Sequence, residues 1–321
     1  MNHVFTEDIV PSAEPDANWR DELREGEGKR ALITGLRGFT GQYMARELAA
    51  AGYHVYGTVK SSLETGPDIF TADLLDRAAL AAVVEQTRPD VVVHLAGIAF
   101  VAHDDVEQMY RVNVAGTRNL LEALARGAHK PACVLLVSSA NIYGNAAVPV
   151  IDESVAPAPA NDYAVSKLAM EYMARLWMAR LPIVIARPFN YTGVGQHENF
   201  LLPKIVSHFR KGARRIELGN LAIARDFSDV RMVVKSYRRL LSQSRGGEIF
   251  NICSGHSYSL ESVIEMMSDI AGYHIDVHVN PAFVRANEVL TLSGNNVKLA
   301  RAIGIIESPP LVDTLRWMYE A

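Results

Sequence analysis

The chain has 321 residues, of which 49% are hydrophobic and 21% charged, and its formal net charge is -4. This size suits one large or two modest domains with a sizeable core. The charges are well mixed, no apolar run reaches transmembrane length, and the N-terminus lacks the pattern of a secretory signal. We therefore expect no nucleic acid or membrane as partner and a cytoplasmic location. Cys133 and Cys253 lie in apolar runs, which predicts core positions and leaves no disulfide framework or metal cluster.

Residues 1–28 are polar and contain two prolines, which predicts a flexible N-terminal extension. The fold begins with an apolar segment at 30–34. The sequence Gly-Leu-Arg-Gly-Phe-Thr-Gly follows at 35–41, then a helical pattern and a second apolar segment at 52–58. Such a βαβ unit is typical of dinucleotide binding, because glycines let the backbone approach a pyrophosphate and the helix N-terminus presents N–H groups to it. The spacing is GxxGxxG rather than GxGxxG.

Predicted strands and helices alternate through the next part of the chain. Apolar segments at 89–97, 133–139 and 182–187 predict buried parallel strands. Helical patterns occur at 78–87, about 105–125, and from Tyr163 to 176. This rhythm predicts a doubly wound α/β sheet of the Rossmann type.

The pattern loosens after residue 187. It predicts helices at about 200–211, 228–242 and 260–271 and at the C-terminus, with short strands at 216–219 and 248–253. Ser228 or Asp229 is the expected N-cap of the second of these helices. We assign 29–189 plus about 225–253 to a dinucleotide-binding domain. A smaller α/β substrate-binding domain would take about 190–224 plus 254–321.

Tyr163 and Lys167 lie four residues apart, which places them on one face of a helix. A free tyrosine has a pKa of about 10 and is a poor acid–base group at neutral pH. A nearby ammonium group favours the phenolate, so we expect Lys167 to lower the pKa of Tyr163. The pair could then exchange a proton with a substrate oxygen.

Together these motifs resemble the extended short-chain dehydrogenase/reductase family, which includes NAD-dependent epimerases and dehydratases. The resemblance runs from about Lys29 to the C-terminus. The motifs that carry it are Thr34-Gly35-x-x-Gly38-x-x-Gly41, Asp73-Leu74, His94-Leu95-Ala96-Gly97, Asn113, Ser138-Ser139-x-x-x-Tyr143-Gly144, Tyr163-x-x-x-Lys167, Arg187-Pro188-Phe189-Asn190 and Arg225-Asp226-Phe227.

The resemblance implies a role for each matching position. Tyr163 would be the general acid, Lys167 would bind the nicotinamide ribose, and the Ser139 hydroxyl would hold the reacting oxygen, Ser138 being the neighbouring choice. Residues implied on the cofactor side are Gly35, Arg37, Gly38, Phe39, Gly41, Lys60, Asp73, Leu74, Leu95, Ala96, Gly97, Asn113, Pro188 and Phe189. Residues implied on the substrate side are Ser139, Asn141, Asn190, Asn199, Arg225, Arg285 and Glu288.

Some of these residues also have purely structural interpretations. His94 ends an apolar segment and is expected to be a packed core histidine, and Tyr143 is expected to pack rather than react. Asn113 could serve only to bend its helix, and Arg225 could be a surface charge.

Cofactor choice can be argued from charge at the end of the second predicted strand. An acidic residue there would bind the ribose hydroxyls of NAD(H) and repel a 2′-phosphate. Here the strand continues into Lys60, Ser61 and Ser62, and Arg37 lies in the glycine turn. We therefore expect NADP(H) to be preferred, with NAD(H) possible.

The family contains 4,6-dehydratases, 4-epimerases and 4-ketoreductases. Its dehydratases carry an acidic pair just after the reactive Ser or Thr, where this chain has Ala140 and Asn141, so a dehydratase is not expected. The whole pattern is most similar to the enzymes that reduce GDP-4-keto-6-deoxy-D-mannose to GDP-D-rhamnose or GDP-6-deoxy-D-talose. These enzymes act in deoxysugar biosynthesis, including that of lipopolysaccharide O-antigen, and are usually homodimers.

Three alternatives remain open from the sequence. The substrate could be a dTDP-4-keto-6-deoxy sugar, giving for example dTDP-6-deoxy-L-talose. The chain could be a UDP-sugar 4-epimerase with tightly bound NAD. It could also be a non-catalytic dinucleotide-binding regulator, although such proteins typically lose the Tyr–Lys pair that is present here.

Overall fold

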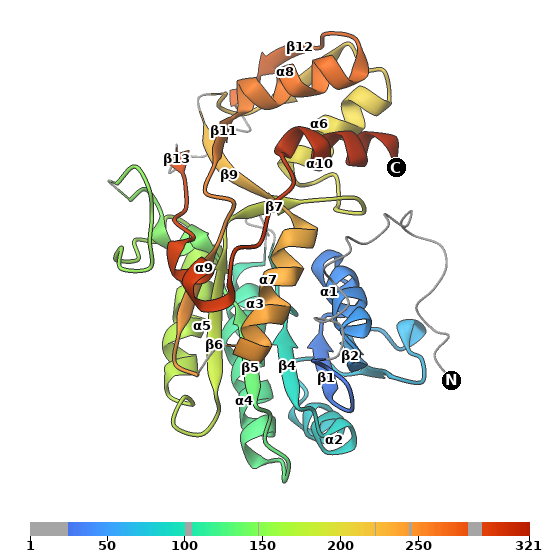
Figure 1. Cartoon of the computed structure of the whole chain (residues 1–321), viewed down its shortest axis with the longest axis vertical. Coiled ribbons are helices and arrows are strands. Elements are labelled where there is room, and N and C mark those ends of the chain that lie inside the picture. Colours follow the sequence, from blue (N-terminus) through green and yellow to red (C-terminus); the bar gives the residue numbers. More distant parts are fainter. Residues whose placement is uncertain (1–24, 100–104, 147, 222, 244–245, 282–290) are drawn as a thin grey trace.

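Seven parallel strands form the central sheet, in the order β10–β6–β5–β4–β1–β2–β3 (Figure 1). The computed structural model describes residues 25–321 except 100–104, 147, 222, 244–245 and 282–290. The strands are β1 (Arg30–Thr34), β2 (His54–Val59), β3 (Ile69–Thr71), β4 (Val91–His94), β5 (Cys133–Val137), β6 (Ile183–Pro188) and β10 (Ile249–Ile252). The predicted Rossmann-type sheet is therefore confirmed.

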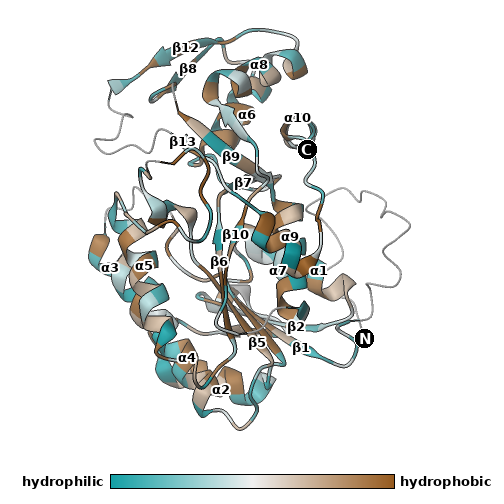
Figure 2. Ribbon diagram, turned by 60° about the vertical axis from the view of Figure 1, so that its left-hand side comes forward, coloured by the Kyte–Doolittle hydropathy of each residue, from teal (hydrophilic) through white to brown (hydrophobic). Residues whose placement is uncertain are grey.

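Both faces of this sheet are buried, as expected for parallel strands whose side chains alternate between two layers of helices. One layer consists of α1 (Phe39–Ala50), α7 (Val230–Gln243) and α9 (Val297–Ile303). The other consists of α2 (Arg77–Thr87), α4 (Thr117–Arg126) and α5 (Asp162–Arg175). Figure 2 shows hydrophobic strands between the two layers. In β1, for example, Ile33 faces the first layer and Leu32 the second.

The predicted helix at 105–125 is interrupted by a wider turn. It consists of α3 (Val106–Tyr110), a π-helical segment (Arg111–Gly116) and α4, and begins at the side-chain cap of Asp105. Asn113 lies in the π segment. Since such wide turns are often found at functional sites, its contacts are described with the site below.

A smaller lobe lies beyond the carboxyl ends of the strands (Figure 1). Its own hydrophobic core is built mainly from α6 (Leu201–Arg210), α8 (Leu260–Ala271), α10 (Leu311–Glu320) and β8 (Arg215–Leu218). β8 pairs with β12 (Asp276–Val279), and β9 (Ala224–Asp229) pairs with β7 (Asn190–Thr192), β11 (Ser257–Ser259) and β13 (Thr291–Leu292). Most of these pairings join segments far apart in the chain.

The structure differs from the sequence prediction in further respects. The helix expected from Ser228 begins two residues later, because β9 continues to Asp229. Asp229 still accepts from the amide of Arg231 at 2.7 Å, as a helix-start residue does. The strands β3, β7, β9, β11, β12 and β13 were not predicted. Residues 25–28, counted with the extension, form a turn in which the Gly26 amide donates to Ala51 O at 2.9 Å.

The proposed division into two domains remains a proposal. It would give β10 and α7 to the first domain, where β10 pairs with β6 and α7 packs against α1. The helix α9 packs in the same layer as α7, so it would belong there as well, and not with the residues after 254.

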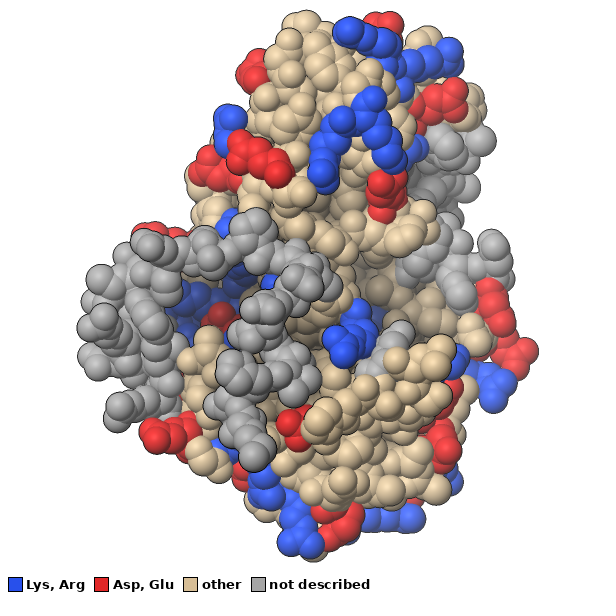
Figure 3. Space-filling view, turned by 90° about the vertical axis from the view of Figure 1, so that its right-hand side faces the viewer, with Lys and Arg blue, Asp and Glu red and all other residues tan. Residues whose placement is uncertain are grey.

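Charged side chains of both signs lie close together on the face shown in Figure 3, on the smaller lobe as well as on the sheet domain. Among the described residues, no helix combines the length and the apolar character needed to cross a membrane.

Candidate active site

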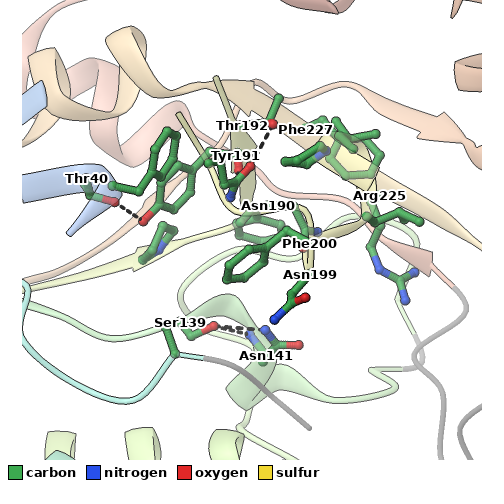
Figure 4. Close-up of a pocket in the computed structure, with 18 of the residues that line it drawn as sticks. Thr40, Ser139, Asn141, Asn190, Tyr191, Thr192, Asn199, Phe200, Arg225 and Phe227 are labelled. Carbon is green, nitrogen blue, oxygen red and sulfur yellow. Dashed lines mark hydrogen bonds between the residues drawn. The ribbon is translucent and has the colours of Figure 1, made fainter. Parts of the chain in front are cut away.

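A cavity of about 720 Å³ lies where the carboxyl ends of the strands meet the smaller lobe. Ligands of open α/β sheets bind at this edge. The walls on the sheet side come from the turn after β1 and from the ends of β4, β5 and β6. The opposite wall comes from β7, α6, β8 and β9. Figure 4 shows side chains from both sides pointing into the same space.

Two glycines of the turn after β1 have no room for a side chain. A Cβ on Gly41 would lie 2.3 Å from the carbonyl oxygen of Gly35, and a Cβ on Gly35, whose φ is +74°, would lie 2.9 Å from Ala96. Gly38 is the N-cap of α1, and among the described residues no side chain caps this helix end. The first N–H groups of α1 and its positive dipole end therefore face the cavity, an arrangement suited to a phosphate.

The end of β4 is held by polar contacts within the protein. His94 is buried, with its ring nitrogens 2.7 Å from Thr34 Oγ1 and 2.8 Å from Thr117 Oγ1. Burial lowers its pKa to about 3, so the ring is neutral, as expected of a core histidine. The Asn113 carboxamide pairs with both backbone groups of Ile98 and contacts Ser166 Oγ.

These contacts place Asn113 behind Gly97, where a Cβ would come 2.9 Å from Asn113 Oδ1 and 3.7 Å from Lys167 Nζ. The hydrogen bonds of the Asn113 side chain to Ile98 and Ser166 therefore support a structural role for this residue. Any effect on a cofactor would be indirect, through the backbone at Gly97.

Three candidate catalytic side chains line the cavity together. Ser139 follows β5, while Tyr163 and Lys167 lie in the first turns of α5, whose N-cap Asn161 accepts from the Ala164 amide. Lys167 Nζ donates to Val137 O at 2.9 Å, and the Tyr163 hydroxyl is hydrogen-bonded to Ser139. The helical spacing predicted from the sequence brings all three to one point.

The protonation states differ from the sequence expectation. Burial raises the pKa of Tyr163 to about 12, against a smaller lowering by the hydrogen bond to Ser139. Burial also lowers the pKa of Lys167 to about 8. The expected lowering of the tyrosine pKa by Lys167 was therefore wrong for this state of the protein, because desolvation dominates. Tyr163 carries its proton at neutral pH.

Ser139 also contacts Asn141, at the start of a 3-10 helix (Ala140–Tyr143). Its Oγ lies 3.2 Å from the Asn141 backbone nitrogen and 3.1 Å from Asn141 Nδ2 (Figure 4). Ser138 Oγ, in contrast, is buried and has no hydrogen-bond partner among the described residues. This difference supports Ser139 over Ser138 as the reactive serine.

A buried ion pair connects β6 to the helix α5, which carries Tyr163 and Lys167. Arg187 on β6 forms a two-pronged pair with Glu171 on α5, at 3.0 and 2.7 Å, and donates to the Tyr143 hydroxyl at 2.8 Å. Tyr143 in turn donates to Asn251 at 2.8 Å. The packing role expected for Tyr143 fits this network. Glu171 lies one turn after Lys167 and was not predicted as part of the site.

The predicted substrate side chains Asn190, Asn199 and Arg225 line the opposite part of the cavity (Figure 4). Asn190 Nδ2 is buried and has no partner among the described residues. Arg285 and Glu288 lie outside the described residues.

Other lining residues were missed by the sequence analysis. Tyr191 directly follows the Arg187–Asn190 motif, and its hydroxyl lies 2.8 Å from Thr40 Oγ1. Lys204 and Asn220 face the cavity from α6 and from the segment after β8. The Gly219-Asn220 turn signal was visible in the sequence, but its position beside α6 was not.

Some predicted cofactor residues lie outside the main cavity walls. Arg37 is exposed in the glycine turn. Lys60 follows β2 and pairs with Asp73 at 3.6 Å, with 76% of its side chain exposed. Leu74 is buried and packs toward Gly116, where a Cβ would come 2.8 Å from Leu74 Cβ. Leu95, Gly97, Phe39, Pro188 and Phe189 line the cavity with the glycine turn.

The cavity therefore joins a phosphate-type turn to a protonated tyrosine and a lysine. Within the described residues, no group of His, Cys, Asp or Glu side chains could hold a metal ion. Such a site can give a proton to a substrate oxygen beside a bound dinucleotide.

Comparison with known proteins gives a consistent picture. The family model described as GDP-mannose 4,6 dehydratase matches residues 32–308. The chain is 34% identical over 278 residues to GDP-6-deoxy-D-talose 4-dehydrogenase of Aggregatibacter actinomycetemcomitans. It is 35% identical over 289 residues to GDP-6-deoxy-D-mannose reductase of Pseudomonas aeruginosa. Each alignment covers 86% of this chain and 91% of the relative.

Two solved structures are also similar. A candidate epimerase from Burkholderia cenocepacia J2315 is 55% identical with a TM-score of 0.86, over 92% of this chain and 98% of that one. RMD from Pseudomonas aeruginosa, solved with NADPH, is 32% identical with a TM-score of 0.79, over 91% and 98%.

Proposed function

Because the chain belongs to the GDP-mannose 4,6 dehydratase family, we propose that it is an oxidoreductase that reduces the C4 ketone of a GDP-linked 4-keto-6-deoxyhexose. The product would be GDP-6-deoxy-D-mannose (GDP-D-rhamnose) or its C4 epimer GDP-6-deoxy-D-talose. The observation that carries the proposal is the protonated Tyr163, hydrogen-bonded to Ser139 in a cavity that also contains the glycine turn. The two relatives at 34% and 35% identity are named for these two sugars.

The glycine turn and the residues around it fit a nicotinamide dinucleotide. Gly35, Gly38 and Gly41 let the backbone of the turn pack closely, since a Cβ at each would come within 3.2 Å of a neighbouring protein atom, and the uncapped start of α1 would hold the pyrophosphate. Gly97 and Pro188 would border the nicotinamide end. When bound, the reduced cofactor supplies a hydride to the carbonyl carbon.

We propose NADP(H) as the preferred form, with NAD(H) possible. Lys60 is cationic and follows β2, at the place where an acidic residue would select NAD(H). RMD of Pseudomonas aeruginosa, which has a similar fold, was solved with NADPH.

Tyr163 would donate its proton to the carbonyl oxygen as that oxygen gains negative charge. The raised pKa keeps the phenol protonated beforehand. The Lys167 ammonium would then stabilise the phenolate that remains, an interaction that grows only during the reaction. The Ser139 hydroxyl would donate to the same oxygen. Asn141, Asn190 and Asn199 would contact the sugar and phosphates, and Arg225 the diphosphate, with Arg285 and Glu288 proposed from the resemblance alone.

A second candidate is a nucleotide-sugar 4-epimerase, since the Burkholderia cenocepacia structure, at 55% identity, is described as a candidate epimerase. An epimerase returns its hydride to the sugar and consumes no cofactor. A dTDP-linked substrate would change the contacts to the base and to the 2′ position of the pentose.

We also propose a cytoplasmic homodimer formed through the α3–α4 and α5 helices. Several apolar side chains of these helices are exposed, including Leu176 (80%), just after α5, and Tyr172 (55%). Analytical ultracentrifugation would give a dimer mass if this is right and a monomer mass if it is wrong.

The proposed reaction can be tested by incubating the purified protein with NADPH and one keto sugar at a time. Loss of NADPH equal to the product formed from GDP-4-keto-6-deoxy-D-mannose would support the proposal. Loss only with the dTDP-linked keto sugar would change the nucleotide. Interconversion of UDP-hexoses without net cofactor loss would replace the reductase with an epimerase. NMR of the reduced sugar would identify its C4 configuration.

A further inference from the structure

Asn141 controls the surroundings of one catalytic hydroxyl. Ser139 Oγ has three polar neighbours: the Asn141 backbone nitrogen at 3.2 Å, Asn141 Nδ2 at 3.1 Å, and the Tyr163 hydroxyl. The first two both come from the same residue. Figure 4 shows the Asn141 side chain lying along Ser139 at the floor of the cavity.

The chemistry of these neighbours sets the direction of the hydrogen bonds. A backbone N–H and a carboxamide NH2 can only donate, and a serine hydroxyl has two lone pairs and one proton. Asn141 therefore occupies both acceptor positions of Ser139. The single Ser139 O–H therefore remains for donation to Tyr163 Oη or to a substrate oxygen beside it.

We propose that Asn141 is a positioning residue that fixes this direction, so that the order Asn141 N–H to Ser139 O–H to the reacting oxygen is set before substrate binds. The inference rests on the proposed ketone reduction. Asn141 would then orient the Ser139 hydroxyl in addition to contacting the sugar. In that order the Tyr163 proton also points away from Ser139, toward the substrate.

A carboxylate at this position would do the opposite. Ionised Asp or Glu side chains only accept hydrogen bonds. An aspartate at 141 would accept a hydrogen bond from the Ser139 hydroxyl and so turn that hydroxyl away from the reacting oxygen. It would also place a negative charge near the oxygen that becomes negative during the reaction. Loss of one preorganised donor to such an oxygen typically lowers kcat by about 100- to 1,000-fold.

The groups around this position set the expected pH behaviour. Tyr163 and Lys167 face it from α5, and Tyr143 lies on the same 3-10 helix with Arg187 beneath. The other titratable or charged groups that line the cavity are Tyr191, His197, Lys204 and Arg225. Within the described cavity lining no carboxylate is present. An aspartate at 141 would therefore be the carboxyl group of this lining whose protonation at acidic pH the experiment follows.

The test uses Asn141→Asp, which keeps the size of the side chain. We expect kcat at neutral pH to fall about 100-fold with KM changed less than about threefold, because the lost donor acts on the transition state. As pH falls and the carboxyl gains a proton, kcat of the variant should recover relative to wild type. Asn295→Asp is the charge-matched control. Its carboxylate can still accept from the Val297 amide outside the cavity lining, and it should keep wild-type kcat.

A double-variant comparison separates positioning from general damage. If Asn141 acts mainly through Ser139, Asn141→Asp should lower kcat by a much smaller factor in a Ser139→Ala background than the roughly 100-fold expected in the wild-type background, the remaining loss being due to the added charge. The inference would be overturned if the kcat loss of the double variant equalled the product of the two single losses. It would also be overturned if Asn141→Asp kept the wild-type kcat and pH profile. Absence of turnover in the wild type would instead overturn the proposed function. A melting temperature and NADPH affinity equal to wild type would show that the variant is folded.

Discussion

The two sides of the cavity are built in different ways. On the sheet side, most of the shape comes from backbone and small residues near strand ends, such as the glycine turn after β1 and the β4 end at Gly97. On the lobe side, segments far apart in sequence are joined by side chains. Buried Asp226 on β9 accepts from Ser254 at 2.9 and 2.7 Å and from the Gly255 amide at 2.9 Å.

Because the two sides are built differently, substitutions on them should have different effects. In the proposed reaction the sheet side would hold the cofactor and supply the proton, and its features are local and recur as motifs. The lobe side would determine which sugar nucleotide fits, and its features depend on long-range packing. Substitutions on the first side should change chemistry or cofactor affinity, and those on the second should change KM or the stability of the lobe.

The largest effect is expected for Tyr163→Phe. Removing the phenolic proton should lower kcat by about 1,000-fold, within the usual range for a general acid. NADPH affinity, measured by fluorescence titration, should stay within about twofold of wild type because the ring remains. Equal loss of binding and turnover would mean that Tyr163 supports the sheet side structurally.

Breaking the buried pair beneath the site comes next. Glu171→Leu would leave the Arg187 guanidinium, only 3% exposed, without its carboxylate, and should lower the free energy of unfolding by about 3–5 kcal/mol. The Arg215–Glu217 pair on β8 of the lobe is exposed on both sides, at 58% and 46%. Arg215→Met should therefore cost less than about 1 kcal/mol. Chemical denaturation of both variants would give the comparison, and equal losses would contradict it.

Gly41→Ala tests the glycine turn directly. The added Cβ would come 2.3 Å from Gly35 O and 2.6 Å from Leu36 O, so the backbone must shift. We expect NADPH affinity to fall more than about tenfold, which corresponds to about 1.4 kcal/mol. Gly212→Ala is the control in the lobe. Its φ is +65° with open space around it, so it should cost about 1 kcal/mol of stability and leave NADPH affinity unchanged.

His94 should give a smaller, pH-dependent effect. Its pKa is lowered from 6.5 to about 3, so the unfolded chain binds a proton there at pH values where the folded protein does not. Its contribution to stability is complete above pH 6.5 and is lost as pH falls from 6.5 to about 3, with a slope of up to about 1.4 kcal/mol per pH unit. His94→Gln should flatten this part of the stability profile. An unchanged profile in urea titrations would argue against a neutral, buried His94.

The smallest effect is expected at Lys60, which is largely exposed and already 3.6 Å from Asp73. Lys60→Ala should reduce the preference for NADPH over NADH by about three- to tenfold, consistent with the small energy of exposed charge pairs. The ratio of the two kcat/KM values measures it. A ratio that does not move would show that the 2′-phosphate is recognised elsewhere, for instance at Arg37.

The same contrast explains what could be read from the sequence. The strands β1, β4, β5 and β6, the glycine turn and the Tyr163–Lys167 helix follow from local periodicity and spacing, and the structure has them. The small strands β7, β9, β11 and β13 are two to six residues long and are formed by partners distant in the chain, so local patterns could not identify them. The Glu171–Arg187 pair was missed for the same reason. The raised pKa of Tyr163 was missed because burial cannot be read from spacing.

The most direct measurement follows the hydride. NADPH carrying deuterium at the transferred position of its nicotinamide would be mixed with GDP-4-keto-6-deoxy-D-mannose and the enzyme. We expect one deuterium at C4 of the 6-deoxyhexose for each NADPH oxidised, seen by NMR and mass spectrometry, and we expect the Tyr163→Phe variant to incorporate almost none. A product isomerised without deuterium and without NADPH loss would contradict a reductase and favour the epimerase.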